Sequence, residues 1–207
     1  MIVAISLLLT GCRWNDVQTK RSFVRWNLNN LRGSASVACP SPALELASRN
    51  SKQLACLMEN SPAPTVEQLS GKWRGINKGL GAALVNLTQD IKEFQVDGSC
   101  VHGNNISVKQ VPIDHLERCG FEAEVDKDTC QPKRNGNFIV CRDADPNQPL
   151  RLDYTIAENK WNDPSKVLVD KLVSIDDDLL LGRAYAKIGL VKIPVAYFVL
   201  YRPTCHR

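Results

Sequence analysis

The sequence has 207 residues, of which 43% are hydrophobic and 23% are charged, and its net charge at pH 7 is +4. These values are typical of an ordinary globular protein and exclude a fibrous repeat or a largely disordered chain. The stretch from Arg13 to Ala38 has five basic residues and one acidic residue, which accounts for the whole net charge. Because nucleic-acid-binding domains carry their basic surplus on the folded body, this distribution argues against nucleic acid as a partner.

The first predicted element is an apolar segment that starts at Met1 and ends in Leu9-Thr10-Gly11-Cys12. This motif resembles the lipobox of bacterial lipoproteins. The resemblance implies a signal peptide over residues 1–11, cleavage before Cys12, and a diacylglyceryl group with fatty acids such as palmitate on the Cys12 sulfur. Two or three acyl chains hold a domain on a membrane without a spanning helix. An ordinary cleaved signal, or a short apolar strand, is the alternative interpretation.

Residues 12–64 are predicted to form a lipidated tether and a helical arm. Basic and aromatic residues are interleaved after Cys12, and such a segment either settles at an anionic membrane surface or forms a solvated tether. Ser41 and Pro42 have the residue types of a helix N-cap and first position, and apolar residues follow with helical spacing. Cys39 and Cys56 bracket this helix. We expect them to form a disulfide that contributes about 3 kcal/mol.

Eight cysteines in an exported chain indicate an oxidising compartment. If Cys12 is acylated, seven remain, so one is unpaired or pairs with another molecule. The connectivity of the others is left open by the sequence: Cys100, Cys119, Cys130, Cys141 and Cys205. There is no C-x-x-C motif, and the three histidines lack zinc-site spacing, so we predict no metal and no cofactor.

Residues 65–207 are predicted to form the main domain, which opens with a short helical turn at Thr65-Val66-Glu67-Gln68. Turn residues then recur about every 10 residues, which is typical of short antiparallel strands. Segments with strand character are 72–74, 84–96, 105–111, 120–125, 137–141, 151–156, 166–175, 179–187 and 193–201. Alternation places Leu152, Tyr154 and Ile156 on one face of their strand. Residues 176–178, three consecutive aspartates, are predicted to be the turn of a hairpin.

About eight short strands with no long helix between them favour a mainly β fold, an antiparallel barrel with an N-terminal helical arm. An open β-sandwich is the alternative. A helical turn followed by Gly71-Lys72-Trp73 resembles the opening of lipocalin and calycin barrels. In that family the tryptophan seals the closed end, often against an arginine of the last strand, which implies these roles for Trp73 and Arg202. Residues 150–154, 180–185 and 196–200 also resemble uncharacterised bacterial proteins of calycin-like fold.

Side-chain alternation nominates the residues that line the barrel. An eight-stranded barrel is filled by its own side chains or holds one small ligand. The candidate ligand contacts are Trp73, Tyr154, Leu181, Tyr185, Tyr197 and Val199, and a plain core role is the alternative for each. The sequence has no Ser-His-Asp context, phosphate-binding loop or paired-carboxylate constellation. We therefore predict no catalytic residue and do not expect an enzyme.

The sequence predicts a lipid-anchored cell-envelope protein, at the outer membrane and facing the periplasm, whose barrel binds or carries an apolar small molecule or lipid. The alternative is a structural or protein-interaction module of the envelope without a small-molecule ligand. A third hypothesis, an enzyme acting on lipid or cell-wall material, requires His115 and a carboxylate within hydrogen-bond reach. The sequence identifies neither the ligand nor a protein partner.

Overall fold

The computed structural model describes residues 42–79, 88–97, 100–111, 122–141 and 148–202. Its first elements are three helices: α2 (Pro42–Ser48), α3 (Ser51–Asn60) and α4 (Val66–Leu69). The strands are β1 (Gly71–Lys78), β2 (Gln89–Asp97), β3 (Cys100–Ser107), β4 (Arg134–Cys141), β5 (Leu150–Asp153), β6 (Leu168–Asp176), β7 (Leu179–Ile188) and β8 (Val191–Tyr201). A short 3-10 helix, η2 (Pro164–Val167), leads into β6.

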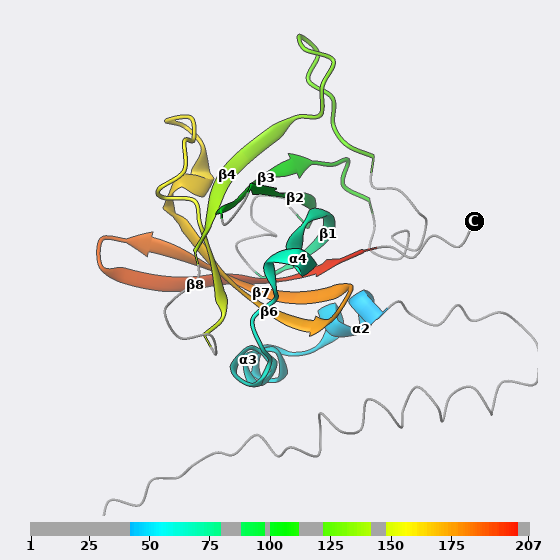
Figure 1. The fold of residues 1–207 in the computed structure, drawn as a ribbon, viewed down its shortest axis with the longest axis vertical. Helices are drawn as coiled ribbons and strands as arrows, with labels where there is room; N and C mark the ends of the chain where they lie inside the picture. The colour runs from blue at the N-terminus through cyan, green and yellow to red at the C-terminus, as the bar shows by residue number, and fades with distance from the viewer. Residues whose placement is uncertain (1–41, 80–87, 98–99, 112–121, 142–147, 203–207) are drawn as a thin grey trace, which may run out of the picture. The chain divides into compact units, whose positions relative to one another are not determined.

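The eight strands form a closed antiparallel barrel in simple chain order (Figure 1). Each strand pairs with the next one, and β1 also pairs with β8 from Arg74↔Tyr201 to Lys78↔Tyr197. This last pairing closes the sheet, so the predicted barrel is confirmed and the open sandwich is wrong. The hairpin turn predicted at the three aspartates is also present, between β6 and β7.

Two apolar clusters lie on opposite faces of the sheet. The interior cluster joins residues from around the barrel, including Trp73, Phe94, Phe138, Tyr154 and Phe198. The outer cluster lies between α2, α3 and the strands that they contact; it consists of Ala43, Leu46, Leu54, Leu57, Met58, Ile76, Val173, Leu181 and Val199. The segment predicted as a helical arm therefore shares a core with the barrel over residues 42–60.

The helical segment is two helices and not the single helix that its apolar spacing predicts. Asn50 starts the second helix: its side chain accepts a hydrogen bond from the Gln53 backbone, and the Gln53 side chain accepts one from the Asn50 backbone. Such a capping box stabilises a new N-terminus. Lys78 of β1 donates to the Ala47 carbonyl at 2.9 Å, which fixes the end of α2 against the barrel. The predicted N-cap Ser41 lies outside the described residues.

Two strand predictions are wrong. Residues 122–125 of the segment 120–125 form isolated bridges, Val108↔Ala123 and Val125↔Pro132, and not a strand of the barrel. The strand predicted over 151–156 ends at Asp153. There the Asp153 carboxylate accepts hydrogen bonds from the backbone and hydroxyl of Thr155, which turns the chain. Ile156 is consequently 56% exposed instead of sharing a buried face with Leu152 and Tyr154.

Among the described residues, no helix combines the length and apolar character needed to cross a membrane.

Candidate functional site

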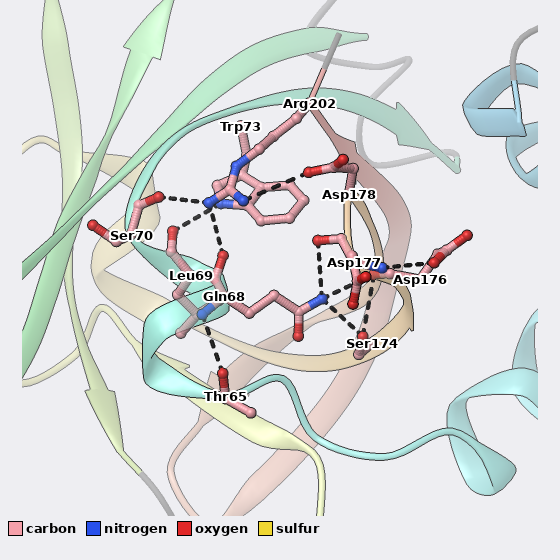
Figure 2. A network of polar contacts seen from close by, with 10 residues as sticks. All are labelled: Thr65, Gln68, Leu69, Ser70, Trp73, Ser174, Asp176, Asp177, Asp178 and Arg202. Atoms are coloured by element: carbon pink, nitrogen blue, oxygen red, sulfur yellow. Dashed lines mark hydrogen bonds and ion pairs between the residues drawn. The ribbon is translucent and has the colours of Figure 1, made fainter. Parts of the chain in front are cut away.

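One end of the barrel, the closed end, is sealed by a stack of Arg202 on Trp73 (Figure 2). Trp73 is fully buried near the start of β1, and its indole Nε1 donates to the Leu69 carbonyl of α4 at 2.8 Å. The Arg202 guanidinium lies 4.2 Å from the indole centroid and donates to the carbonyls of Gln68 and Ser70. The stack that the calycin resemblance implies is therefore present. The role of this stack is structural, because both side chains donate hydrogen bonds to carbonyls of α4 and of the residue that follows it.

The side chain of Gln68 ties α4 to the β6–β7 turn at the same end. Its amide nitrogen donates to the Ser174 hydroxyl at 2.9 Å and to the carbonyls of Asp176 and Asp177. Asp178 lies 3.6 Å from Arg202. Thr65 caps α4 by accepting from the Gln68 backbone (Figure 2). The three aspartates thus form a hairpin turn whose backbone carbonyls accept hydrogen bonds from Gln68.

Above this end, aromatic rings fill the interior. Phe138 packs edge-on against both Phe94 and Tyr154, with ring centroids 5.2 Å apart in each pair. The three rings and Phe198 come from β2, β4, β8 and the residue that follows β5. Phe138 and Phe198 lie over Gly103 and Gly182, where an added Cβ would come within 2.5 Å and 2.0 Å of the rings. The missing Cβ at these glycines leaves room for the two rings.

A buried ionic cluster lies among these rings, and we define it as Lys92, Asp90, Asp170 and Tyr154. Each of the four side chains belongs to a residue that is at most 5% exposed. The Lys92 ammonium donates to the Tyr154 hydroxyl at 2.6 Å and lies 3.6 Å from Asp170 and 3.8 Å from Asp90. It also donates to the Asn105 side-chain carbonyl at 2.8 Å. The ammonium therefore has two hydrogen-bond acceptors and two carboxylates within ion-pair distance.

The end of the barrel opposite the Trp73–Arg202 stack is called the distal end. Asp90, Asp170 and Tyr154 of the ionic cluster lie toward this end, whereas Lys92 pairs with Trp73 in the β1–β2 register and extends its side chain to them. Asp90 and Asp170 lie in the first residues of β2 and β6, and Tyr154 follows directly after β5. These positions adjoin the β1–β2 and β5–β6 connections, whereas Trp73 and Arg202 lie at the other ends of their strands. Gly75 permits this arrangement, since a Cβ there would come within 1.9 Å of the Asp90 carboxylate.

Burial shifts the protonation equilibria of the ionic cluster. It raises the pKa of Asp170 above 3.8, although the Lys92 charge and the Tyr154 hydrogen bond act in the opposite direction. Burial, followed by the nearby Asp170 and Asp90 charges, holds the pKa of Tyr154 well above its ordinary value. Tyr154 is therefore a neutral phenol that donates to Asp170 Oδ2 at 3.0 Å. Two carboxylates face one ammonium, so the fully ionised cluster carries a net negative charge.

One oxygen of the ionic cluster lacks a hydrogen bond. Asp170 Oδ1 is buried and has no partner within the described part of the chain. Buried polar atoms of native proteins are nearly always satisfied, and exceptions mark strain, unplaced water or a functional contact. An acceptor of this kind, surrounded by aromatic rings, suits a small molecule that presents a hydrogen-bond donor or a positive charge.

The structure separates the sequence-predicted ligand contacts into two groups. Trp73 and Tyr154 belong to the interior cluster. Leu181, Val199 and Tyr197 belong to or pack on the outer cluster, so their expected place in the interior is wrong. Tyr185 lies near Tyr197, because the Arg183 guanidinium is 5.3 Å from the Tyr185 ring and 5.0 Å from the Tyr197 ring. Alternation correctly divided the residues of β7 and β8 between two faces. It did not show which face is inside the barrel, because α2 and α3 bury the outer face as well.

Sequence reasoning missed the residues that make the ionic cluster. A signal was present: Asp170 alternates with Leu168 and Leu172, and Lys92 alternates with Phe94. A charged residue in the register of buried apolar neighbours marks either a strand bend or an interior polar site. Only the pairing of distant strands shows that the charges compensate one another, since Lys92, Tyr154 and Asp170 come from β2, the segment after β5, and β6.

The cysteine and histidine predictions are tested only in part. Cys130 and Cys141 are free thiols, so these two do not pair with one another. Cys12, Cys39, Cys119 and Cys205 lie outside the described residues, and the Cys39–Cys56 pairing stays a prediction. His115 lies outside them too. His102 is exposed on β3, where it contacts Gln95 at 3.1 Å, and the described residues hold no cluster of His, Cys, Asp or Glu suited to a metal.

The molecule is thus a closed eight-stranded barrel with an aromatic and ionic interior, sealed at one end by a helical turn. No family model and no curated protein matches the sequence. Among solved structures, a protein from Thermomonospora curvata is similar over 91% of this chain and 99% of its own, with 14% identity and a TM-score of 0.46.

Two further solved structures are similar over about two thirds of this chain. The siderocalin Ex-FABP has 8% identity and a TM-score of 0.33, over 65% of this chain and 71% of its own. The zebrafish ileal bile acid-binding protein, in complex with cholic acid, has 12% identity and a TM-score of 0.31, over 66% of this chain and 99% of its own. Their ligands are properties of those proteins, and the fold of this chain is established by its own strand pairing.

Proposed function

We propose that this protein binds a compact, mainly apolar small molecule in the distal half of its barrel. The observation that carries the proposal is the buried Asp170 Oδ1 beside Lys92 and Tyr154, for which the described residues offer no hydrogen-bond partner. Apolar residues of similar volume generally make a core at least as stable as a buried ion cluster does. An ionic cluster among aromatic rings is therefore costly as pure core and useful as a recognition group.

The geometry favours a ligand with one hydrogen-bond donor or a positive charge at the end of an apolar body. The donor would reach Asp170 Oδ1, and the body would contact the faces of Phe138, Tyr154 and Phe198, which already surround the Lys92 ammonium at 5.1 to 5.6 Å. The closed half is occupied by Trp73 and its neighbours. This arrangement supports a small ligand at the distal end in preference to a long acyl chain running through the barrel.

Binding is tested with N-phenylnaphthylamine, an apolar fluorophore that has a single N–H donor. The purified full-length chain is expected to enhance its fluorescence saturably. Asp170→Asn replaces the charged acceptor and should weaken binding about tenfold, because a hydrogen bond to a charged group contributes about 1.5–3 kcal/mol. Tyr154→Phe removes the hydroxyl that orients Asp170 while keeping the ring, and should weaken binding severalfold.

The matched control is Tyr197→Phe, the same chemical change on the outer face of β8. It should leave probe affinity unchanged. Equal affinity in all variants, or no saturable signal together with ligand-free protein in native mass spectrometry, would overturn the proposal. The interior would then be core, and the envelope interaction module would be the better hypothesis.

We also propose that the chain is exported, acylated at Cys12 and held at the outer membrane facing the periplasm. The lipobox-like Leu9-Thr10-Gly11-Cys12 and the eight cysteines support this proposal. The intact mass of protein extracted from membranes should show cleavage before Cys12 and added acyl groups, and Cys12→Ser should make the protein extractable from membranes by a high-salt wash. The same mass counts closed disulfides, including the proposed Cys39–Cys56 bridge. An unacylated chain with reduced thiols would overturn this assignment.

We propose binding without catalysis. The sequence lacks the nucleophile, phosphate-loop and paired-carboxylate motifs that common enzyme classes require, and this supports the proposal.

A further inference from the structure

Exposed apolar side chains are concentrated at the distal end of the barrel. Of the eleven large hydrophobic side chains that are exposed among the described residues, only Val96 and Ile139 lie elsewhere on the barrel. The nine at the distal end are Val111, Val125, Ile156, Trp161, Val167, Ile188, Leu190, Val191 and Ile193. Single exposed apolar residues are normal, whereas a contiguous exposed apolar group marks an interaction surface, and the four residues of the β7–β8 hairpin adjoin one another.

The strongest part of this surface is the tip of the β7–β8 hairpin, residues 186–193. β6 pairs with β7 only as far as Leu168↔Ala186, and β1 pairs with β8 only as far as Lys78↔Tyr197. The tip therefore projects beyond its neighbours as a two-stranded ribbon, seen in orange in Figure 1. Gly189, with a φ of 60°, makes the turn, and Leu190 beside it is fully exposed.

The hairpin tip is amphipathic and purely cationic. The pairs Ile188↔Val191 and Ala186↔Ile193 share one face of the ribbon, whereas Lys187↔Lys192 face each other on the opposite side. Like charges directly opposite one another destabilise a strand pair. The sequence has no acidic residue after Asp178, so no carboxylate of β7 or β8 balances these two lysines.

We propose that the hairpin tip is a second membrane contact, which inserts into an anionic lipid surface. Leu190 and its apolar neighbours would enter the acyl region, and the two lysine stems would extend back to place their ammonium groups at the phosphates. The paired positive charges and the absence of an acidic residue in this ribbon select an anionic surface over an uncharged partner. This contact is independent of both the barrel ligand and acylation at Cys12.

The test measures flotation of the full-length Cys12→Ser chain with lipid vesicles, so that acyl chains do not contribute. One set of vesicles contains phosphatidylcholine alone and the other contains phosphatidylcholine mixed with phosphatidylglycerol. Leu190→Ser combined with Val191→Ser should lower partitioning into the anionic vesicles about tenfold, because apolar area is lost. The matched control, Val96→Ser combined with Ile139→Ser, removes exposed apolar residues elsewhere on the barrel and should have no effect.

The charge requirement is tested in the same assay. Lys187→Gln combined with Lys192→Gln should lower binding to the anionic vesicles about tenfold and leave the weak binding to phosphatidylcholine unchanged. Lys52→Gln combined with Lys72→Gln is the matched control, because these lysines lie on α3 and at the closed end of β1. Basic residues before Ala38 are identical in all variants, so they cancel in the comparison.

Two results would overturn the proposal. One is equal partitioning of the hairpin variants and their controls. The other is a dimer of the parent chain in sedimentation velocity that Leu190→Ser dissociates, since the hairpin tip would then cover a second copy. Both results are independent of N-phenylnaphthylamine binding in the barrel, so failure here is distinguishable from failure of the proposed ligand site.

Discussion

The two ends of the barrel are built in opposite ways. At the closed end, Trp73, Arg202 and Gln68 direct their donors to backbone carbonyls of α4 and of the β6–β7 turn. Toward the distal end, Asp170 contacts the Lys92 ammonium but keeps one oxygen unsatisfied within the described residues, and the hairpin tip exposes its apolar groups.

The difference shows how one small barrel separates stability from recognition. Hydrogen bonds to backbone fix the position of α4 because carbonyl groups of a strand or turn cannot move independently of the fold. A buried side-chain network rigidifies a core when every member is satisfied, whereas among the described residues Asp170 Oδ1 is left without a partner and can accept from an incoming polar group. Substitutions at each end test this division of roles.

Replacing the tryptophan of the closed end should have the largest effect on stability. Trp73→Ala removes a fully buried indole and the surface on which Arg202 stacks, and should lower the free energy of unfolding by about 4 kcal/mol. Urea denaturation followed by circular dichroism measures it. Trp161→Ala is the control: this side chain is 89% exposed at the distal end and should change stability by less than about 0.5 kcal/mol. Equal losses would contradict a stability role confined to the closed end.

Breaking the ionic cluster should cost somewhat less. Lys92→Met leaves Asp90 and Asp170 buried without their shared cation and should lower the free energy of unfolding by about 3 kcal/mol. Adding Asp90→Asn and Asp170→Asn to this variant should recover much of the loss, because no uncompensated charge remains. The same denaturation experiment measures both. If Lys92→Met left the free energy of unfolding unchanged, the carboxylates would be hydrated or protonated and the ammonium would not hold them together.

The arginine of the closed end should make a smaller contribution. Arg202→Lys keeps the charge but loses the planar stack on Trp73 and the hydrogen bonds to Gln68 and Ser70, and should destabilise by about 1 kcal/mol. Arg183→Lys, which loses stacking on Tyr197 at the outer face, is the matched control and should cost less. A larger loss in the control would assign the outer face a greater structural role than the closed end.

Much of the fold follows from local patterns in the sequence. Short alternating segments and turn residues indicated an antiparallel barrel, and Gly71-Lys72-Trp73 with Arg202 indicated how one end is sealed. Two of the wrong predictions share a cause: a local hydrogen bond between a side chain and the backbone overrides the apolar pattern. Asp153 bonds to Thr155 and ends a strand early, and Asn50 starts a second helix inside one apolar pattern.

The candidate site was far less accessible to sequence reasoning. Alternation divides Leu181 from Leu180 correctly, but both faces of β7 are buried, so hydrophobicity does not show which one is inside. The ionic cluster depends on strand register, because Lys92 and Asp170 are far apart in sequence and neither position alone shows that an opposite charge lies beside it. Register is set by the whole sheet, and no short motif encodes it.

The smallest expected effect is a pH dependence that separates the two regions. Burial raises the pKa of Asp170 above its unfolded value of 3.8, so the folded protein holds this proton more tightly than the unfolded chain does. The associated stabilisation is complete below about pH 3.8 and is lost as the pH rises through the folded-state pKa. Asp170→Asn does not titrate, so the fall in stability above pH 3.8 should be shallower in this variant than in the parent chain.

Asp163 provides a control whose pKa is shifted in the opposite direction. It lies outside the barrel interior, at the start of η2. Partial burial raises its pKa, but hydrogen bonds from Ser165 and Gly136 outweigh burial and hold the pKa below 3.8. Its stabilisation is present above pH 3.8 and is lost as the pH falls through the folded-state pKa, so Asp163→Asn should flatten the acid side of the profile. Melting temperatures across this pH range measure both slopes. If Asp170→Asn leaves the slope above pH 3.8 unchanged, the Lys92 charge outweighs burial, and the distal carboxylate is as fully ionised as one at the surface.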